Sequence, residues 1–111
     1  MKIVAVLSCP TGLASVFIAE AALKKAARNR GVQIKIETRS SLGVENEITV
    51  FDLYSSHIGI ITKGIDLSEK KWIESKPLIE VDLRDIPLNK ESIIDEAVNC
   101  ICKNEFCRII R

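Results

Sequence analysis

The 111-residue sequence lacks an excess of either charge and has no long hydrophobic run. Its 16 Lys and Arg residues nearly cancel its 15 Asp and Glu residues, so it has none of the basic excess typical of nucleic-acid-binding proteins. The N-terminal stretch "MKIVAVLSCP" has an apolar run too short for a membrane span and no signal-peptide cleavage site. We therefore expect a cytoplasmic protein of one domain, spanning residues 1–111, without nucleic-acid partners or direct membrane insertion.

The sequence also lacks the clusters that bind metals or form disulfide frameworks. It contains four cysteines and one histidine. Without a secretory signal, cytosolic thiols stay reduced, so we expect no disulfides. Cys100, Cys102 and Cys107 lie close together in the sequence, but no nearby histidine or fourth cysteine completes a tetrahedral zinc site. We expect these three to be packing or surface thiols.

The hydrophobic pattern that is present predicts alternating strands and helices. Apolar runs predict four short strands, at residues 2–8, 32–38, 57–63 and 76–83. Helical spacing predicts a long helix over 13–30, before Gly31, and a last helix over about 89–104. Between them we expect a polar loop at 39–47, a short helical turn capped by Thr49 and Asp52, and a loop with one helical turn at 64–76.

This alternation indicates an α/β fold with a parallel sheet, right-handed crossovers and helices on both faces. We expect a small doubly wound, three-layer, Rossmann-like sandwich whose four-stranded parallel sheet has the order 2-1-3-4. Ligands of such folds bind beyond the carboxyl ends of the strands, beside the first strand. Cys9 and the loop at 39–47 both fall at this edge.

Cys9 is the candidate nucleophile at this edge. It shortly precedes the first long helix, whose first N–H groups lack partners and whose dipole favours an anion. A cysteine so placed commonly has its pKa lowered by about one to several units, which makes it reactive. Gly12 allows close backbone approach, and Thr11 and Ser15 offer hydroxyl donors. The spacing alone fits equally well a cysteine that only fills space at a strand end.

Several catalytic motifs are missing around Cys9. A tyrosine-phosphatase-like site needs Cys-x5-Arg, but Ser15 stands at the arginine position. A thioredoxin-like site needs a second cysteine where Gly12 stands. Nucleotide loops of the GxGxxG or GxxxxGK[ST] type are missing as well. These absences leave a cysteine that can accept and pass on a phosphoryl group without being built to hydrolyse it.

The stretch "CPTGLASVF" (9–17) resembles the loop C-P-T-G-I-A-H-T-F of the IIB component of fructose-type permeases in the sugar phosphotransferase system. The segments "AEAALKKAARNRGVQIKIET" (19–38) and "SLGVENEIT" (41–49) are similar to further motifs of that family. The resemblance implies that Cys9 accepts a phosphoryl group from a phosphohistidine of a IIA partner. Cys9 then donates it to fructose or a similar sugar held by the membrane-embedded IIC permease, and no metal or cofactor is required.

The resemblance also implies two loops around the cysteine. Backbone N–H groups of the first loop would hold the phosphate oxygens, and it comprises Pro10, Thr11, Gly12, Leu13, Ala14, Ser15 and Val16. The second loop contains Arg39, Ser41, Gly43, Glu45 and Asn46. We expect an apolar fringe for partner docking, formed by Leu13, Val16, Phe17 and Leu42. His57 is expected to have a surface or capping role at the start of the third strand rather than a catalytic one.

The sequence departs from the family pattern within both loops. Ser15 and Val16 stand where the family has a His-Thr pair, and Arg39 stands where it has a glutamine. We expect Arg39 to be a solvated loop arginine rather than a phosphate ligand. The Ser15-Val16 pair leaves open an alternative of another class, a regulatory or interaction module derived from a IIB domain with altered phosphotransfer. A thiol phosphatase or reductase is disfavoured by the missing arginine and second cysteine.

Overall fold

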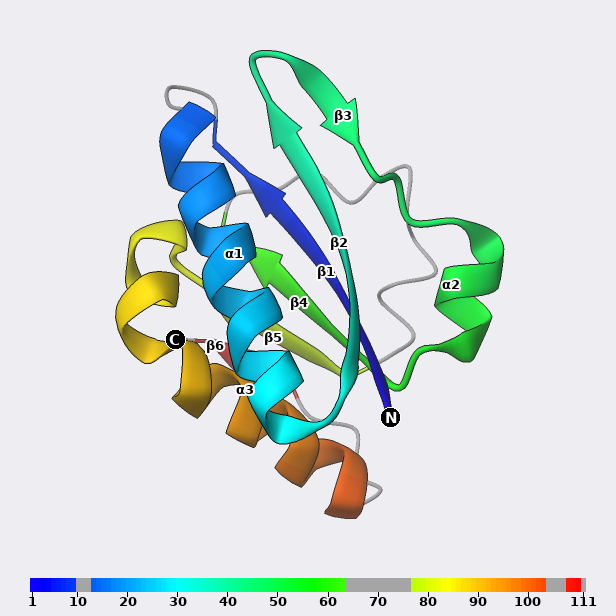
Figure 1. Cartoon of the computed structure of the whole chain (residues 1–111). Coiled ribbons are helices and arrows are strands. Elements are labelled where there is room, and N and C mark those ends of the chain that lie inside the picture. The colour runs from blue at the N-terminus through cyan, green and yellow to red at the C-terminus, as the bar shows by residue number, and fades with distance from the viewer. Residues whose placement is uncertain (10–12, 64–76, 104–107, 111) are drawn as a thin grey trace.

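The computed structural model describes residues 1–9, 13–63, 77–103 and 108–110. Strands and helices alternate along most of the chain, as the hydrophobic pattern predicts (Figure 1). In chain order the elements are β1 (Lys2–Ser8), α1 (Leu13–Arg30), β2 (Gln33–Ser40), β3 (Gly43–Glu45), α2 (Val50–Ser55), β4 (Ile58–Thr62), β5 (Leu78–Val81), a 3-10 turn (Leu83–Asp85), α3 (Ile86–Lys103) and β6 (Arg108–Ile110).

The described strands form one six-stranded sheet in the order β3-β2-β1-β4-β5-β6. The four strands β2, β1, β4 and β5 are parallel and follow the predicted order. The prediction of only four strands is wrong at both edges, because β3 pairs antiparallel with β2 and β6 pairs parallel with β5. Both edge strands are only three residues long, and β3 is exposed throughout, so neither gives a hydrophobic pattern that a sequence search would detect.

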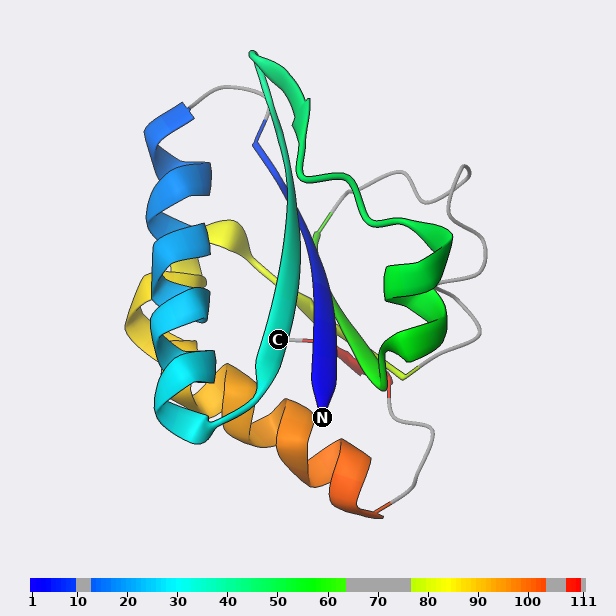
Figure 2. The ribbon, with the colours of Figure 1, turned by 45° about the vertical axis from the view of Figure 1, so that its right-hand side comes forward.

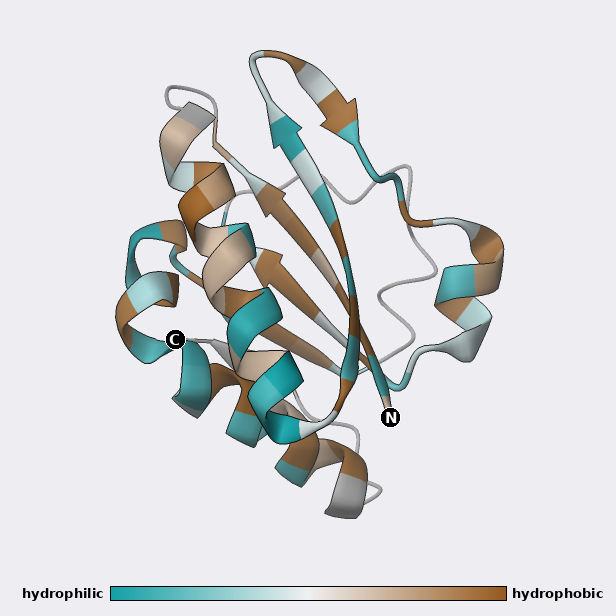
Figure 3. Ribbon diagram, in the orientation of Figure 1, coloured by the Kyte–Doolittle hydropathy of each residue, from teal (hydrophilic) through white to brown (hydrophobic). Residues whose placement is uncertain are grey.

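Helices cover both faces of the sheet, which confirms the three-layer, doubly wound architecture. Helices α1 and α3 lie side by side on one face, whereas α2 lies on the other (Figure 2). The core between the sheet and the α1–α3 layer includes Ile3, Ala5 and Leu7 of β1, and the smaller core on the α2 side includes Val4 and Val6. Figure 3 shows that the central strands are hydrophobic and that polar residues line the outer parts of the helices.

The helix ends follow local sequence signals. Helix α1 spans the predicted residues, and Gly31 after it has a φ of 75°, which only glycine adopts at little cost. Thr49 and Asp52 form the predicted capping box of α2. Helix α3 begins at Ile86, three residues before the predicted start at Asn89. The backbone angles of Asn89 are non-helical (φ −117°, ψ 19°) and produce a kink there. The predicted loop and turn at 64–76 lie outside the described residues.

Candidate functional site

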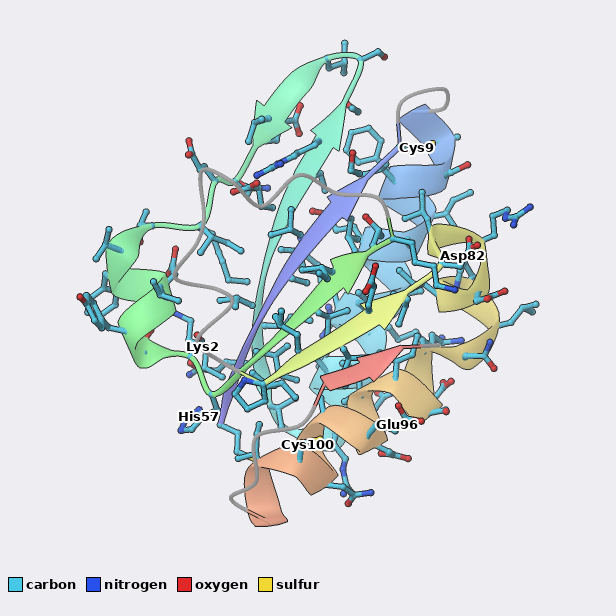
Figure 4. All side chains as sticks on the ribbon, turned by 180° about the vertical axis from the view of Figure 1, so that it is seen from behind. Lys2, Cys9, His57, Asp82, Glu96 and Cys100 are labelled. Carbon is cyan, nitrogen blue, oxygen red and sulfur yellow. The ribbon has the colours of Figure 1, made fainter. Side chains whose placement is uncertain are left out.

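Cys9 directly follows β1, at the carboxyl end of the parallel strands (Figure 4). Its backbone N–H donates to the carbonyl oxygen of Arg39 at 3.2 Å, which continues the pairing of β1 with β2. The residue is half-buried and packs partly against the core beneath α1. Cys9 therefore lies where the sequence predicts it, neither sealed in the core nor fully exposed.

A pocket of about 210 Å³ adjoins Cys9. It is lined by Ser8, Cys9, Arg39, Ser40, Ser41, Gly43 and Val44. The fold thus brings the cysteine together with Arg39, Ser41 and Gly43 of the predicted second loop. This volume is below the range of about 300–1,000 Å³ typical of small-molecule sites, so the pocket suits a small group rather than an enclosed organic ligand.

The segment predicted as the second loop is in fact a β-hairpin. Strand β2 continues to Ser40, and β3 pairs Val44 with Arg39 and Gly43 with Ser40. Gly43 has a φ of 105°, and Ser40 Oγ accepts from the N–H of Leu42 at 3.2 Å, so both stabilise the turn. The hairpin projects beyond the carboxyl end of β1 (Figure 1).

Two predicted residues of this segment, Glu45 and Asn46, are exposed. Neither belongs to the described lining of the Cys9 pocket. Asn46 has a φ of 55°, a left-handed conformation that asparagine tolerates better than most residues. Both therefore lie in the hairpin and its exit rather than against the cysteine.

The predicted phosphate-binding loop is only partly described. Leu13 begins α1, and the exposed Ala14 and Ser15 follow in its first turn. Pro10, Thr11 and Gly12 lie outside the described residues. Helix α1 has no acidic residue in its first turn, so no carboxylate there opposes the positive end of its dipole.

The predicted apolar fringe is partly wrong. The side chain of Val16 is fully buried because it packs into the core between α1 and the sheet, so it cannot contact a partner. Phe17 is half-buried, whereas Leu42 at the hairpin tip is 67% exposed. Val44, which the sequence analysis did not single out, is 54% exposed and lines the pocket. The hairpin therefore carries two exposed apolar residues, of which Val44 lines the Cys9 pocket.

Arg39 is not the solvated loop arginine that we expected. It lies in β2, its side chain is only 21% exposed, and its Nε donates to Glu37 Oε2 at 2.8 Å. The second oxygen, Glu37 Oε1, accepts from the N–H of Ile48 at 3.0 Å. The expectation fails because the strand extends further than predicted and a buried carboxylate lies two residues earlier on the same face.

Sequence reasoning missed Glu37, which is fully buried. Lys35, Glu37 and Arg39 alternate along β2 and resemble a solvent-facing polar stripe. The signal that could have revealed the pair is the i, i+2 spacing of opposite charges on one strand face. A buried carboxylate is costly unless it is paired and hydrogen-bonded, and both conditions hold here.

The amino ends of the strands carry a separate polar network. Lys2 Nζ donates to Asp52 Oδ1 at 3.1 Å and to Ser55 Oγ at 2.9 Å. His57 is exposed, and its Nδ1 accepts from the backbone N–H of Lys2 at 3.1 Å, which confirms the capping role expected of it. A pocket of about 400 Å³ lies here, lined by Met1, Lys2, Gly31, Gln33, Phe51, Ser55 and His57. Figure 4 shows Lys2 and His57 at the opposite end of the sheet from Cys9.

The pKa of Asp52 in this network is lowered from 3.8 to about 2. The main cause is the hydrogen bond that its carboxylate accepts from the backbone N–H of Thr49, at 3.0 Å. Hydrogen bonds from Lys2 and from the Thr49 hydroxyl, and the charge of Lys2, act in the same direction. The carboxylate therefore stays ionised at neutral pH and stabilises the start of α2.

Two features of the described part of the chain bear on other functions. Its His, Cys, Asp and Glu residues include no group of three placed to hold a metal ion. Its helices include none with the length and apolar character needed to cross a bilayer.

Comparison with known proteins gives consistent similarities. Residues 4–96 match the family model described as "PTS system, Lactose/Cellobiose specific IIB subunit". The chain is 35% identical over 95 residues to the "PTS system fructose-like EIIB component 2" of Escherichia coli (strain K12), covering 86% of this chain and 90% of that protein. It is 33% identical over 104 residues to component 1 of the same strain, covering 94% and 96% of the two chains.

Solved structures show the same similarity. A domain of the fructose-specific IIABC component of Borrelia burgdorferi superposes with a TM-score of 0.80 at 35% identity, covering 88% of this chain and 93% of that one. The Enzyme IIB subunit of the PTS system from Escherichia coli K12 superposes with a TM-score of 0.81 at 33% identity, covering 93% and 95% of the two chains.

Proposed function

Because this chain belongs to the IIB family of the sugar phosphotransferase system, we propose that Cys9 is its phosphoryl-carrying residue. IIB components are phosphotransferases that work with IIA and IIC components. The observation that carries the proposal is the position of Cys9, half-buried beside a small pocket at the carboxyl end of β1 and close to the start of α1. This position suits a nucleophile that must meet two different partners in turn.

In the first step, the Cys9 thiolate attacks the phosphorus of a phosphohistidine on the IIA protein. The S–P bond forms as the N–P bond breaks, and its electron pair returns to the imidazole nitrogen. In the second step, a hydroxyl oxygen of the sugar held by the IIC permease attacks the phosphorus and releases its proton to solvent. The O–P bond forms as the S–P bond breaks, and the electron pair of the S–P bond leaves with the Cys9 thiolate. Both steps exchange one phosphorus bond for another, so the protein contributes positioning and charge stabilisation rather than a cofactor.

The α1 dipole supports the ionised thiol and the phosphoryl oxygens. In this proposal the backbone N–H groups of residues 11–16 bind those oxygens. Ser41 and Gly43 line the pocket, and Glu45 and Asn46 shape the hairpin and its exit. The proposal places the protein in the cytoplasm, where the IIA donor and the inner face of the permease are accessible, with fructose or a similar sugar as the final acceptor.

A specific observation favours a second function, a regulatory or interaction module with altered phosphotransfer. Ser15 and Val16 stand where the resembling loop has His-Thr, and the buried Val16 side chain offers no polar group to a phosphate. Retention of Cys9 beside an accessible pocket favours the catalytic function over this one.

The decisive experiment measures the intact mass of the protein after incubation with phosphoenolpyruvate, the general phosphotransfer proteins and a fructose-type IIA. A phosphoryl adduct on the wild type and on Cys100→Ser, but not on Cys9→Ser, supports phosphotransfer through Cys9. Cys100 is a matched control because it is a buried thiol of α3, remote from the pocket. Tight binding of phospho-IIA without any adduct would instead support the regulatory function.

A further inference from the structure

The Glu37 carboxylate is a fully buried charge on the strand next to Cys9. It lies opposite Val6 of β1 in the sheet register, two residues before Arg39, which lies opposite Ser8. Carboxylates are almost never fully buried unless they are paired. The pairing partners of Glu37 therefore indicate what the charge stabilises.

The two oxygens of this carboxylate bind two different segments. Oε2 accepts from Arg39 Nε at 2.8 Å, near the end of β2, and Oε1 accepts from the N–H of Ile48 at 3.0 Å, after β3. The β2–β3 hairpin lies between these two contacts along the chain. Glu37 thus fixes both ends of the hairpin, whose residues Ser41, Gly43 and Val44 form a wall of the Cys9 pocket.

Arg39 connects Glu37 to Cys9, the proposed nucleophile. Its side chain binds Glu37, while its backbone carbonyl accepts from the N–H of Cys9 at 3.2 Å. A displacement of Arg39 would therefore move both the hairpin wall and the backbone that carries the thiol. Errors of about 1 Å in the placement of a reacting group can slow a reaction by about a hundredfold.

We propose that Glu37 and Arg39 are positioning residues for Cys9, because their buried ion pair keeps Cys9 and the hairpin wall of its pocket in fixed relative positions. This inference rests on the proposed phosphotransfer function, whose donor must align with the thiol in this pocket. The pair acts on the geometry of the site rather than on its charge, because the charges of Glu37 and Arg39 cancel. The essential feature is the hydrogen bond from the side chain of residue 39 to the buried Glu37 carboxylate.

The test compares variants at position 39 that keep or remove the donor. Arg39→Met keeps the apolar stem and removes every side-chain N–H, whereas Arg39→Gln keeps a side-chain N–H donor and removes the charge. Glu37→Met/Arg39→Met removes the buried charge as well, and apolar replacement of a buried pair commonly preserves folding. Lys35→Met is the matched control, a cation on the same face of β2 that lies 3.9 Å from Asp52 instead.

Two rates are measured for each folded variant: phosphoryl transfer from phospho-IIA to Cys9, and iodoacetamide alkylation of Cys9 followed by peptide mass. We expect kcat to fall about tenfold or more for Arg39→Met and for the double variant, with KM for the donor within about threefold of wild type. Arg39→Gln should restore most of kcat, and Lys35→Met should leave it unchanged. Alkylation of Cys9 should change in Arg39→Met and be close to wild type in Arg39→Gln.

Two results would overturn the inference. Wild-type kcat in folded Arg39→Met or in the double variant would show that the pair only stabilises the fold. An equal loss in Arg39→Met and Arg39→Gln would show that the guanidinium charge acts on the phosphoryl group directly. If the wild type itself takes no phosphoryl group, the proposed function fails, and the alkylation series still decides whether the pair positions Cys9.

Discussion

At the carboxyl ends of β1 and β2 a pocket of about 210 Å³ adjoins Cys9, whereas at the amino ends a pocket of about 400 Å³ adjoins Lys2 and His57. Three residues that line the larger pocket already have hydrogen-bond partners: Lys2 Nζ binds Ser55 and, outside the lining, Asp52, and His57 binds the Lys2 backbone. The smaller pocket brings a thiol together with the hydroxyls of Ser8, Ser40 and Ser41. Pocket volume and chemical reactivity therefore point to different ends of the sheet.

Strand polarity explains this difference. In a parallel sheet the carboxyl ends of all strands meet the amino ends of the following helices, which collects loops and helix dipoles at one edge. The opposite edge receives the helix carboxyl ends and the short returns into strands. Here that edge contains a part-buried ion pair between Lys2 and Asp52, so its polar residues stabilise the fold.

The largest effect is expected for Cys9, at the carboxyl end of the sheet. Cys9→Ala should abolish phosphoryl transfer, because no other thiol lines the described part of the pocket. The free energy of unfolding should change by no more than about 1 kcal/mol, since Cys9 is only half-buried. Urea denaturation and intact mass measure the two quantities. A loss of several kcal/mol would identify Cys9 as a packing residue and would contradict the assignment of a reactive role to the carboxyl end of the sheet.

The next effect concerns acid stability at the amino end. Hydrogen bonds from the Thr49 backbone and Lys2 lower the pKa of Asp52 from 3.8 to about 2. The unfolded chain binds the proton more readily, so this stabilisation is complete above about pH 4 and is lost as the pH falls toward about 2. Urea denaturation of the wild type should show a steeper loss of stability over this range than that of Asp52→Asn. Equal slopes would contradict the assignment.

Much of this architecture is predictable from the sequence because burial leaves a periodic pattern. The apolar run of β1 and the helical spacing of α1 give both elements their observed bounds. Thr49 and Asp52 predict the capping box from spacing alone. Strands β3 and β6 are missed because each has three residues, too few for any period, and β3 is exposed on both sides.

The site was predictable where it depends on position along the chain, and not where it depends on contacts between strands. Cys9 follows a recognisable strand, so its place at the edge could be inferred. Glu37 Oε1 accepts from the N–H of Ile48, whose side chain packs with Val4 and Val6 of β1, and no local pattern reports this tertiary contact. The same tertiary contact turns Arg39 from an expected surface arginine into a partner of a buried charge.

A smaller stability effect is expected at the N-terminus of α2. Thr49 Oγ1 accepts from the N–H of Asp52 at 3.1 Å. Thr49→Ala should lower the free energy of unfolding by about 1 kcal/mol, and Thr49→Ser, which keeps the hydroxyl, by less. Both variants should transfer phosphoryl groups at the wild-type rate. A Thr49 variant with wild-type stability but slow phosphoryl transfer would link α2 to the reaction and contradict its purely structural role.

The smallest effect is expected for His57, the only histidine of the chain. Its side chain is exposed, and the one hydrogen bond described for that side chain is accepted from the Lys2 backbone N–H, a role that a glutamine carbonyl can also fill. His57→Gln should change the free energy of unfolding by no more than about 0.5 kcal/mol and leave phosphoryl transfer unchanged. The variant is decisive despite this small effect, because an imidazole, like a thiolate, can carry a phosphoryl group. A phosphoryl adduct that persists in Cys9→Ala and is absent from His57→Gln would place the reaction at the amino ends of the strands. It would reverse the assignment of the two pockets.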